Sequence, residues 1–99
     1  MASIRMTHAR AEVLLCLARG PAWGYRISEA TGLGAGTLYP ILHAFEQRGL
    51  VKVERRDELR SDGRSVGRKY YRLTPAGESL LPAARTKVTW SERTAWSPA

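Results

Sequence analysis

Apolar residues recur at spacings of three and four in several stretches of the chain, as they do on one buried face of a helix. The first stretch begins after Thr7, a residue suited to cap a helix, and ends at Gly20 and Pro21, which stop helices. It predicts a helix with a broad apolar stripe made of Val13, Leu14, Leu17 and Ala18, with Ala11 and Leu15 at its margins. A stripe this wide indicates two contacts, one with the domain core and one with another helix, which could come from a second subunit.

Two shorter stretches lie on either side of a glycine-rich turn at residues 32–36. Residues 25–31 predict a second helix, with Ile27 and Ala30 as its apolar positions. Residues 37–48 predict a third helix, whose apolar face consists of Leu38, Ile41, Leu42 and Phe45. Two short helices joined by a tight turn that contains Gly are typical of a helix-turn-helix.

The start of the third helix admits two interpretations, because Pro40 lacks a backbone N–H and fits best in a first turn. In one, Thr37 caps the helix and Pro40 lies in the turn whose N–H groups have no helical partner. In the other, the helix starts near Ala35 and bends slightly at Pro40. In both, Gly49 is placed to end the helix.

Alternation of apolar and polar residues then replaces the helical spacing, at residues 50–56 and again at residues 68–73. This pattern predicts two half-buried strands, joined by a polar loop at residues 57–67. The residues on one face would be Val51, Val53, Tyr71 and Leu73. We expect an antiparallel ribbon, which beside a helix-turn-helix forms a wing.

Thr74 and Pro75 form a helix start, with Thr as the cap and Pro in the first helical position. The apolar stripe that follows consists of Leu80, Leu81, Ala84 and Val88. Pro82 interrupts it and should kink or restart the helix. The expected fold is mainly α with a small β-hairpin wing: a winged helix-turn-helix DNA-binding domain over residues 1–74, then a C-terminal dimerisation helix and tail over residues 75–99.

The charge of the chain adds a class of partner to this fold. The 99 residues hold 16 Lys and Arg against nine acids, a net charge of +7, which suits a polyanion such as nucleic acid or an anionic membrane surface. Residues 52–72 contain eight of the basic residues and four acids. The excess charge therefore lies on the predicted wing, which favours double-stranded DNA as the partner.

Other classes of function lack the residues that they need. Cys16 is the one cysteine, and the two histidines are far apart in the sequence, so no metal or cofactor site is indicated and an enzyme is not expected. Cys16 lies in an apolar run, as a small buried thiol would. With no apolar run of roughly 18 residues and no signal-peptide pattern, we expect no membrane partner and a location in the cytoplasm.

The residues expected to contact DNA lie at the start of the third helix and on the wing. In a helix-turn-helix the second helix lies in the major groove with its N-terminal residues on base edges. This predicts contacts from Gly36, Thr37, Tyr39, Pro40 and His43, with Tyr25 near a phosphate and with Arg60, Arg64, Arg68 and Lys69 on phosphates or in a minor groove. A structural alternative is that Tyr39 and Pro40 pack on a neighbouring helix and that the hairpin is merely solvated.

Apolar residues near the C-terminus are expected at a subunit interface. The predicted interface consists of Leu14, Leu80, Leu81, Ala84, Val88 and Trp90. Trp90 and Trp96 lie in a segment with little else that is apolar, so they could pack on a second subunit, line a pocket for a small aromatic ligand, or belong to a poorly ordered end.

Several motifs in a fixed order resemble the PadR family of bacterial transcriptional regulators. They are Gly24-Tyr25, Gly36-Thr37-Leu38-Tyr39-Pro40 with Leu42, Gly49-Leu50-Val51, and Tyr70-Tyr71-Arg72-Leu73-Thr74 with Gly77. The resemblance implies a winged-helix fold and a homodimer joined mainly by the C-terminal helix with help from the first. It also implies repression at a pseudo-palindromic operator, often relieved by a small aromatic or drug-like ligand. The family usually has a longer dimerisation helix, which Pro82 interrupts here.

A second class of function uses the same fold differently. In this alternative the winged helix is a protein-interaction module, with a solvated wing and a Trp-bearing tail that docks on a partner. The basic wing and the small polar residues at the start of the third helix favour DNA binding over this alternative.

Overall fold

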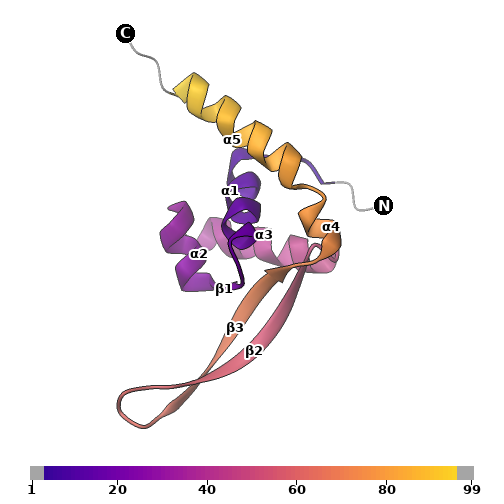
Figure 1. Ribbon diagram of the computed structural model, residues 1–99. Coiled ribbons are helices and arrows are strands. Elements are labelled where there is room, and N and C mark those ends of the chain that lie inside the picture. The colour runs from indigo at the N-terminus through magenta and orange to yellow at the C-terminus, as the bar shows by residue number, and fades with distance from the viewer. Residues whose placement is uncertain (1–3, 96–99) are drawn as a thin grey trace.

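The computed structural model describes residues 4–95, with side chains placed through residue 89 (Figure 1). The elements are, in order, α1 (His8–Ala18), β1 (Ala22–Trp23), α2 (Gly24–Thr31), α3 (Ala35–Gln47), β2 (Val51–Leu59), β3 (Ser65–Leu73), α4 (Pro75–Glu78) and α5 (Leu81–Ala95). The expected fold class, mainly α with a small β wing, is confirmed. The hairpin of β2 and β3 projects away from the helices, and α5 lies across α1 on the opposite side (Figure 1).

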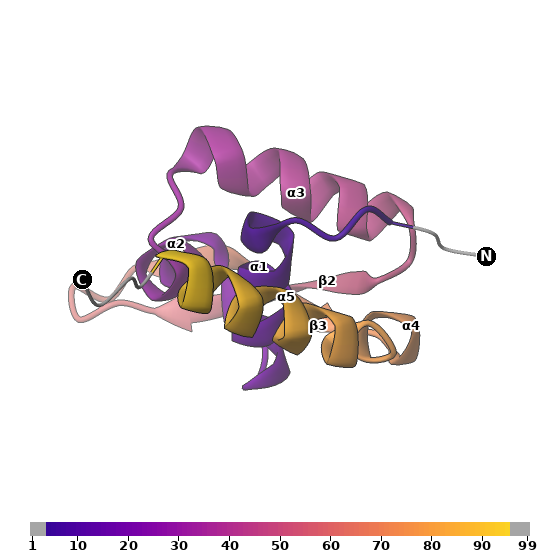
Figure 2. The same ribbon diagram turned by 90° about the horizontal axis from the view of Figure 1, so that it is seen from above.

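One apolar core joins the helices to the base of the hairpin. Its completely buried side chains come from α1, α2 and α3 and include Val13, Leu14, Ile27, Leu38, Leu42 and Phe45. Leu50, Val51 and Leu73 close the core at the base of the hairpin, and Ala84 closes it from α5. Figure 2 shows α1 enclosed between α3 and α5, so α1 is the element around which the others pack.

Helix α1 begins as the sequence predicts. The Thr7 side chain accepts a hydrogen bond from the Arg10 backbone N–H at 3.2 Å, which satisfies one of the free donors of the first turn. Its apolar stripe is narrower than expected, because Ala18 is exposed while Leu17 is buried. In α2, likewise, Ile27 is buried but Ala30 is exposed. An alanine at the margin of a stripe carries too little apolar surface to determine which face of the helix packs against the core.

The turn between α2 and α3 is closed by local hydrogen bonds. Gly32 ends α2 with a φ of +75°, a conformation that costs glycine little, and its N–H bonds the Ser28 carbonyl at 2.8 Å. The Ser28 hydroxyl donates to the Leu33 carbonyl at 2.6 Å. The sequence and the structure therefore agree on a tight helix-turn-helix corner.

Helix α3 starts at Ala35, so Thr37 does not cap it. The cap is Gly34, whose carbonyl accepts hydrogen bonds from Thr37 N–H at 3.1 Å and Leu38 N–H at 2.9 Å. Pro40 therefore lies inside the helix, as the second interpretation has it. The N–H that Pro40 lacks would have bonded the carbonyl of Gly36, and both residues are exposed, so water can satisfy that carbonyl.

The end of α3 is joined to the end of the hairpin. Gly49, with a φ of +71°, and Leu50 turn the chain through hydrogen bonds to the Glu46 and Phe45 carbonyls, a Schellman arrangement. Thr74, the cap of α4, donates its hydroxyl to the Gly49 carbonyl at 2.6 Å. A Cβ added to Gly77 would lie 2.2 Å from the Leu50 carbonyl oxygen, so only glycine fits at this crossing.

The strands are longer than predicted. β2 extends to Leu59 and β3 starts at Ser65, so most of the residues assigned to a loop at 57–67 lie in the ladder, and the connection is only residues 60–64. The register pairs Val51 with Leu73 and Val53 with Tyr71, which confirms the predicted inward face. The sheet also has a third strand that the sequence did not predict: β1 pairs with β3, giving the order β1-β3-β2.

Pro82 restarts the helix rather than kinking it. The chain turns between α4 and α5, and Pro82 is the second residue of α5, where its missing N–H costs no helical hydrogen bond. Within the part of the chain that the structure describes, no helix is both long enough and apolar enough to cross a bilayer.

Candidate nucleic-acid interface

Five residues that the sequence predicts at the interface form one exposed stripe on α3. Gly36, Tyr39, Pro40 and His43 recur at spacings of three and four, and all are exposed, as is Thr37 beside them. Leu38, Leu42 and Phe45 occupy the opposite face and are buried. Tyr39 remains 49% exposed, although the end of its ring also packs against α2, as the structural alternative expects.

The ring of Tyr39 packs against the backbone of α2. A Cβ added to Gly24, the first residue of α2, would lie 2.3 Å from the Tyr39 hydroxyl oxygen, so the ring end rests against the Gly24 backbone. Burial raises the pKa of Tyr71 above its ordinary value, with smaller contributions from Tyr39 and Glu46. Gly24 thus fixes the direction in which α3 presents Tyr39.

A groove separates Tyr39 from the wing. It has a volume of about 400 Å³ and is lined by Trp23, Gly24, Tyr39, Val66, Gly67, Arg68, Lys69 and Tyr71. One wall is therefore α2 and α3, and the other is β3. The two glycines on its walls present backbone to the groove, and Lys69 contributes a positive charge to its rim. A polyanionic strand could lie along such a groove.

The cations of the wing fall into two groups. Arg56 and Arg72 both pair with Glu54, at 3.2 Å and 3.0 Å, and Arg68 pairs with Glu58 at 2.8 Å. The second group has no carboxylate within ion-pair distance among the described residues. It consists of Lys52, Arg55, Arg60, Arg64 and Lys69. Three of the four predicted wing contacts belong to this unpaired group, and one, Arg68, does not.

Arg55 is a member of the second group that sequence reasoning missed. It is exposed on β2 and lies directly opposite Lys69 in the ladder. The sequence did contain the information, because alternate residues of a strand lie on the same side and Arg55 alternates with Val51 and Val53. These residues share the side of the hairpin that continues from the core.

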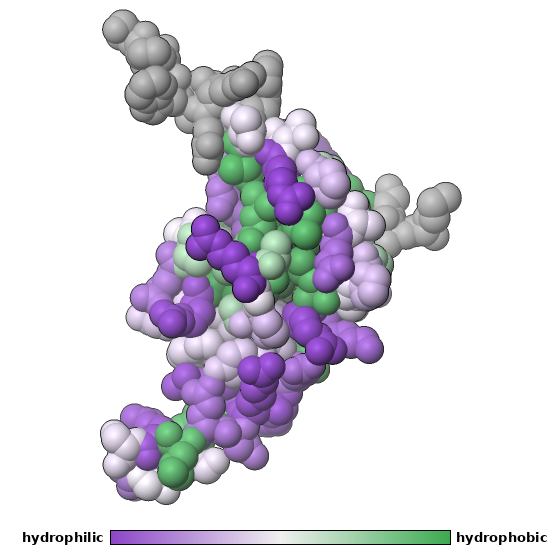
Figure 3. All heavy atoms as spheres, in the orientation of Figure 1, coloured by the Kyte–Doolittle hydropathy of each residue, from purple (hydrophilic) through white to green (hydrophobic). Residues whose placement is uncertain are grey.

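The tip of the wing carries an exposed leucine next to the two arginines that close the hairpin. Arg60 and Arg64 close the hairpin through the Arg60 N–H and the Arg64 carbonyl at 2.7 Å, and Gly63 takes a φ of +85° in the turn. Leu59, next to them, is 80% exposed. Figure 3 shows an apolar spot at the far end of the otherwise polar wing. Sequence reasoning missed this side chain, because Leu59 fell in the predicted loop.

Tyr25 is exposed at the start of α2, beside Trp23. It is the second residue of α2 and is 58% exposed, and its ring centroid lies 5.3 Å from that of Trp23. The exposure of this side chain would let its hydroxyl meet a phosphate that lies along the groove.

The predicted interface residues of the C-terminal half differ in exposure. Leu14 and Ala84 are completely buried in the core of their own chain, so neither reaches the surface. Leu80, Leu81 and Val88 are partly exposed and pack at the margin of that core, together with Leu15 on α1. The Trp90 side chain and the whole of Trp96 lie outside the described part of the chain.

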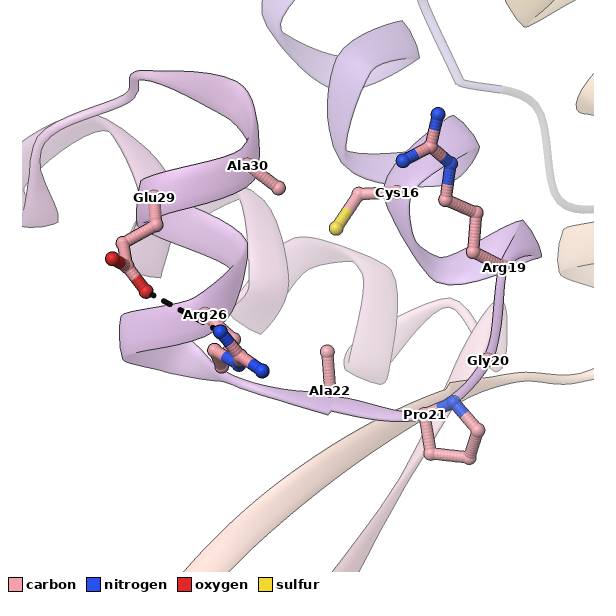
Figure 4. Close-up of a pocket in the computed structure, with 8 residues that line it drawn as sticks. All are labelled: Cys16, Arg19, Gly20, Pro21, Ala22, Arg26, Glu29 and Ala30. Carbon is pink, nitrogen blue, oxygen red and sulfur yellow. Dashed lines mark ion pairs between the residues drawn. The ribbon is translucent and has the colours of Figure 1, made fainter.

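A hollow of about 490 Å³ lies elsewhere, between the end of α1 and α2 (Figure 4). Arg26 and Glu29 form an ion pair of 3.8 Å on its α2 side, and Arg19, the residue that follows α1, lies across from them. Burial raises the pKa of the Cys16 thiol, so this group stays protonated at neutral pH and is a poor nucleophile. No group of three or more His, Cys, Asp or Glu suited to a metal ion occurs among the described residues.

Comparison with known proteins places these features in a family. The sequence profile described as "Transcriptional regulator PadR-like family" matches residues 13–83. "Transcriptional regulator Rv3488" of Mycobacterium tuberculosis (strain ATCC 25618 / H37Rv) is 45% identical over 62 residues, which are 63% of this chain and 48% of that protein. The chain thus spans about half the length of this curated relative.

Solved structures share the fold. A PadR family transcription regulator from Clostridium difficile R20291 superposes with a TM-score of 0.70 at 25% identity, covering 89% of this chain and 94% of that one. AbfR, solved in complex with DNA, superposes with a TM-score of 0.61 at 30% identity, covering 87% of this chain and 59% of that one. The fold is therefore one that a neighbour solved in complex with DNA also has.

Proposed function

Because this chain belongs to the PadR-like family of transcriptional regulators, we propose that it binds double-stranded DNA and regulates transcription. The proposed form is a homodimeric repressor that acts at a pseudo-palindromic operator. One observation carries the proposal: Tyr39 of the exposed α3 stripe and Lys69, a wing cation that lacks an acidic partner among the described residues, lie on opposite sides of a single groove.

The two sides of the groove match the two parts of a DNA duplex. Thr37, Tyr39 and His43 project from the start of α3, where a recognition helix meets base edges in the major groove. Tyr and Pro surfaces suit thymine methyl groups, and the Thr37 hydroxyl suits a base edge or a phosphate. The second group of wing cations then neutralises phosphates beside the helix, and this neutralisation dominates affinity for DNA.

The proposed dimer uses the surface of α1 and α5. Leu15, Leu81 and Val88 are partly exposed there, and Figure 3 shows apolar atoms gathered over these helices. A chain of 99 residues buries a limited fraction of its apolar surface alone, so a second copy would cover this region. Trp90 and Trp96 are proposed to join this interface or to stack a small aromatic effector beside it.

The first test measures binding to duplex DNA as a function of salt. Fluorescence anisotropy with a pool of random duplexes should show an affinity that falls steeply between about 50 and 200 mM salt, because counterions are released from neutralised phosphates. Selection from the same pool should then enrich a two-fold symmetric sequence, with half-sites one helical turn apart or a multiple of it. Absence of binding at the lowest salt would refute DNA binding, and an unsymmetrical single site would refute the dimer.

The second test measures mass in solution by light scattering. The full chain should have twice the mass of the 11.0 kDa protomer. Val88→Glu should give a monomer, because it places a charge in the apolar surface, whereas Thr86→Glu on the exposed side of α5 should remain a dimer. A monomeric wild-type chain would remove the dimer from the proposal and leave a single winged helix.

The effector is tested separately, by quenching of tryptophan fluorescence with small aromatic compounds. Trp90→Phe and Trp96→Phe variants should lose the quenching while Trp23 continues to emit. Quenching that persists in both variants would place the ligand elsewhere.

A further inference from the structure

Four side chains from three separate strands form one connected cluster where the wing leaves the helices. Arg68 on β3 lies with its guanidinium 4.0 Å above the ring of Trp23 on β1. The same guanidinium donates to Glu58 on β2 at 2.8 Å, and the Tyr70 hydroxyl donates to the other oxygen of that carboxylate. This hydrogen bond raises the pKa of Tyr70. We call Trp23, Glu58, Arg68 and Tyr70 the root cluster.

The root cluster continues into a second layer on the same side of the hairpin. Arg56 lies 4.6 Å above the ring of Tyr70, and Glu54 bridges Arg56 and Arg72. Three arginines on this side, Arg56, Arg68 and Arg72, are therefore paired with an acid, whereas Lys52, which lies opposite Arg72, is not paired in the described part of the chain. Arg55 and Lys69, which have the other parity, have no acidic partner among the described residues. Around the root cluster, the arginines on one side of the hairpin are thus paired with acids, whereas the cations on the other side, Arg55 and Lys69, are not paired within the region that the structure describes.

From this division we propose that Arg68 is a positioning residue, which holds the wing at its angle to α2 and α3, and that it does not contact DNA. The inference rests on the proposed DNA binding and refines which residues of that surface carry it. The planar face of the Arg68 guanidinium is occupied by Trp23, and its edge is occupied by Glu58. A phosphate on Arg68 would also lie beside the Glu58 carboxylate, which would repel it.

The root cluster is needed because the sheet itself braces the wing only at its base. β1 has two residues and pairs only with Tyr70 and Tyr71. Beyond Tyr70 no third strand flanks the hairpin in the described part of the chain, so the contact of Trp23 with Arg68 extends the bracing by two residues. A guanidinium suits this task because it can stack on an aromatic ring and bond a carboxylate at the same time, which an ammonium cannot do in the same geometry.

The test compares neighbouring cations that lie on opposite sides of one strand. Lys69→Gln should lower the slope of log affinity against log salt by about 0.9 for each phosphate that is no longer neutralised. Arg68→Gln should leave that slope unchanged while it weakens DNA binding by about two- to fivefold, the scale of one cation–π interaction at an exposed site. In hydrogen exchange, Arg68→Gln should deprotect the amides of β2 and β3 beyond the root cluster, and Lys69→Gln should not.

Two further variants separate positioning from direct contact. Arg68→Lys keeps the charge but not the stacking and the planar fork, so it should behave like Arg68→Gln. Glu58→Gln should not strengthen DNA binding, because Glu58 faces Arg68 rather than a phosphate. A normal affinity in Arg68→Lys, a slope in Arg68→Gln that falls as in Lys69→Gln, or tighter binding in Glu58→Gln would each overturn the proposal.

Failure of DNA binding itself gives a different result. A wild-type chain that binds no duplex would refute the proposed function, whereas the hydrogen-exchange comparison of Arg68→Gln with Lys69→Gln would still report on the bracing of the wing. Equal protection of the hairpin in these two variants would refute the bracing.

Discussion

The exposed stripe of α3 and the wing, the two surfaces proposed to contact DNA, differ in charge and in how they are attached to the core. Residues 35–45 of α3 contain no Lys, Arg, Asp or Glu, and their buried side is fixed in the core by Leu38, Leu42 and Phe45. The wing has eight basic residues and four acids over residues 52–72, and only its base reaches the core. Base contacts specify a sequence, and phosphate contacts supply affinity. The neutral stripe of α3 is therefore suited to distinguish one DNA sequence from another, and the charged wing is suited to bind the phosphate backbone.

The largest expected effect comes from the crossing of Gly77 and Leu50, where the end of α3 meets the end of the hairpin. Gly77→Ala would drive a Cβ into the Leu50 carbonyl, and overpacking against backbone should lower the free energy of unfolding by about 3 kcal/mol. Urea denaturation measures this change, and sequence-specific and non-specific DNA binding should be lost together. Gly36→Ala, where a Cβ meets no atom within 4 Å, should instead stabilise α3 by about 0.5–1 kcal/mol. Equal midpoints for Gly77→Ala and the wild type would contradict this account.

The next effect separates the two surfaces. Gly24→Ala would displace the Tyr39 ring while the core stays intact, because the atom in the way is the end of an exposed side chain. Losing one good base contact costs about 1–3 kcal/mol of discrimination, so the preference for the selected sequence over random DNA should fall about tenfold. The salt slope should not change. Gly34→Ala, which meets no atom within 4 Å, is the matched control. A reduced slope in Gly24→Ala would show that the division between the surfaces is wrong.

The converse experiment removes charge from the wing. Arg55→Gln and Arg64→Gln should each lower the salt slope by about 0.9 for each phosphate left without its cation, because neither side chain has an acidic partner among the described residues. Titrations against random and selected duplexes at several salt concentrations measure this. Affinity should fall by the same factor on both, so discrimination is preserved. A larger decrease on the selected duplex than on the random one would assign base reading to the wing.

The smallest expected effect concerns the apolar wing tip. Leu59→Ser should leave the free energy of unfolding within about 0.5 kcal/mol of the wild type, because the side chain is 80% exposed. If the tip lies against a minor groove, DNA affinity should fall by no more than about threefold, with an unchanged salt slope. Denaturation and anisotropy measure the two quantities. A fall of more than about threefold, or a changed salt slope, would contradict this account.

Local signals in the sequence predicted most of the helical fold. The helix ends are defined by Thr7, Gly49 and Thr74, through hydrogen bonds to residues a few positions away. Because these bonds are local, the nearby sequence is enough to predict them. The stripe of α3 was likewise readable from spacing alone. Pro40 left two starts open because the cost of a missing N–H depends on whether water reaches the orphaned carbonyl, and exposure is not a local property of the sequence.

The wing was less predictable because its contacts join distant residues. Glu58 bonds Arg68 and Tyr70, ten and twelve residues away, and these cross-strand contacts extend strands into a stretch rich in turn-forming residues. β1 has two residues and exists only by pairing with Tyr70 and Tyr71. For the same reason Arg68 looked equivalent to Arg60, Arg64 and Lys69 in the sequence, although the structure shows it paired.

Because β1 is short, the wing is held only near its base and its far end is free to move. The hairpin is held near Tyr70, where β3 pairs with a strand on each side. It can therefore tilt about that point as a rigid body. The arm of β3 from Tyr70 to Ser65 is roughly 17 Å long at about 3.3 Å per residue, so a tilt of about 10° moves its end by about 3 Å. A movement of this size would let the tip follow differences in groove width among DNA sequences. The stiffness of this attachment would then set how narrow a range of groove shapes the tip accepts.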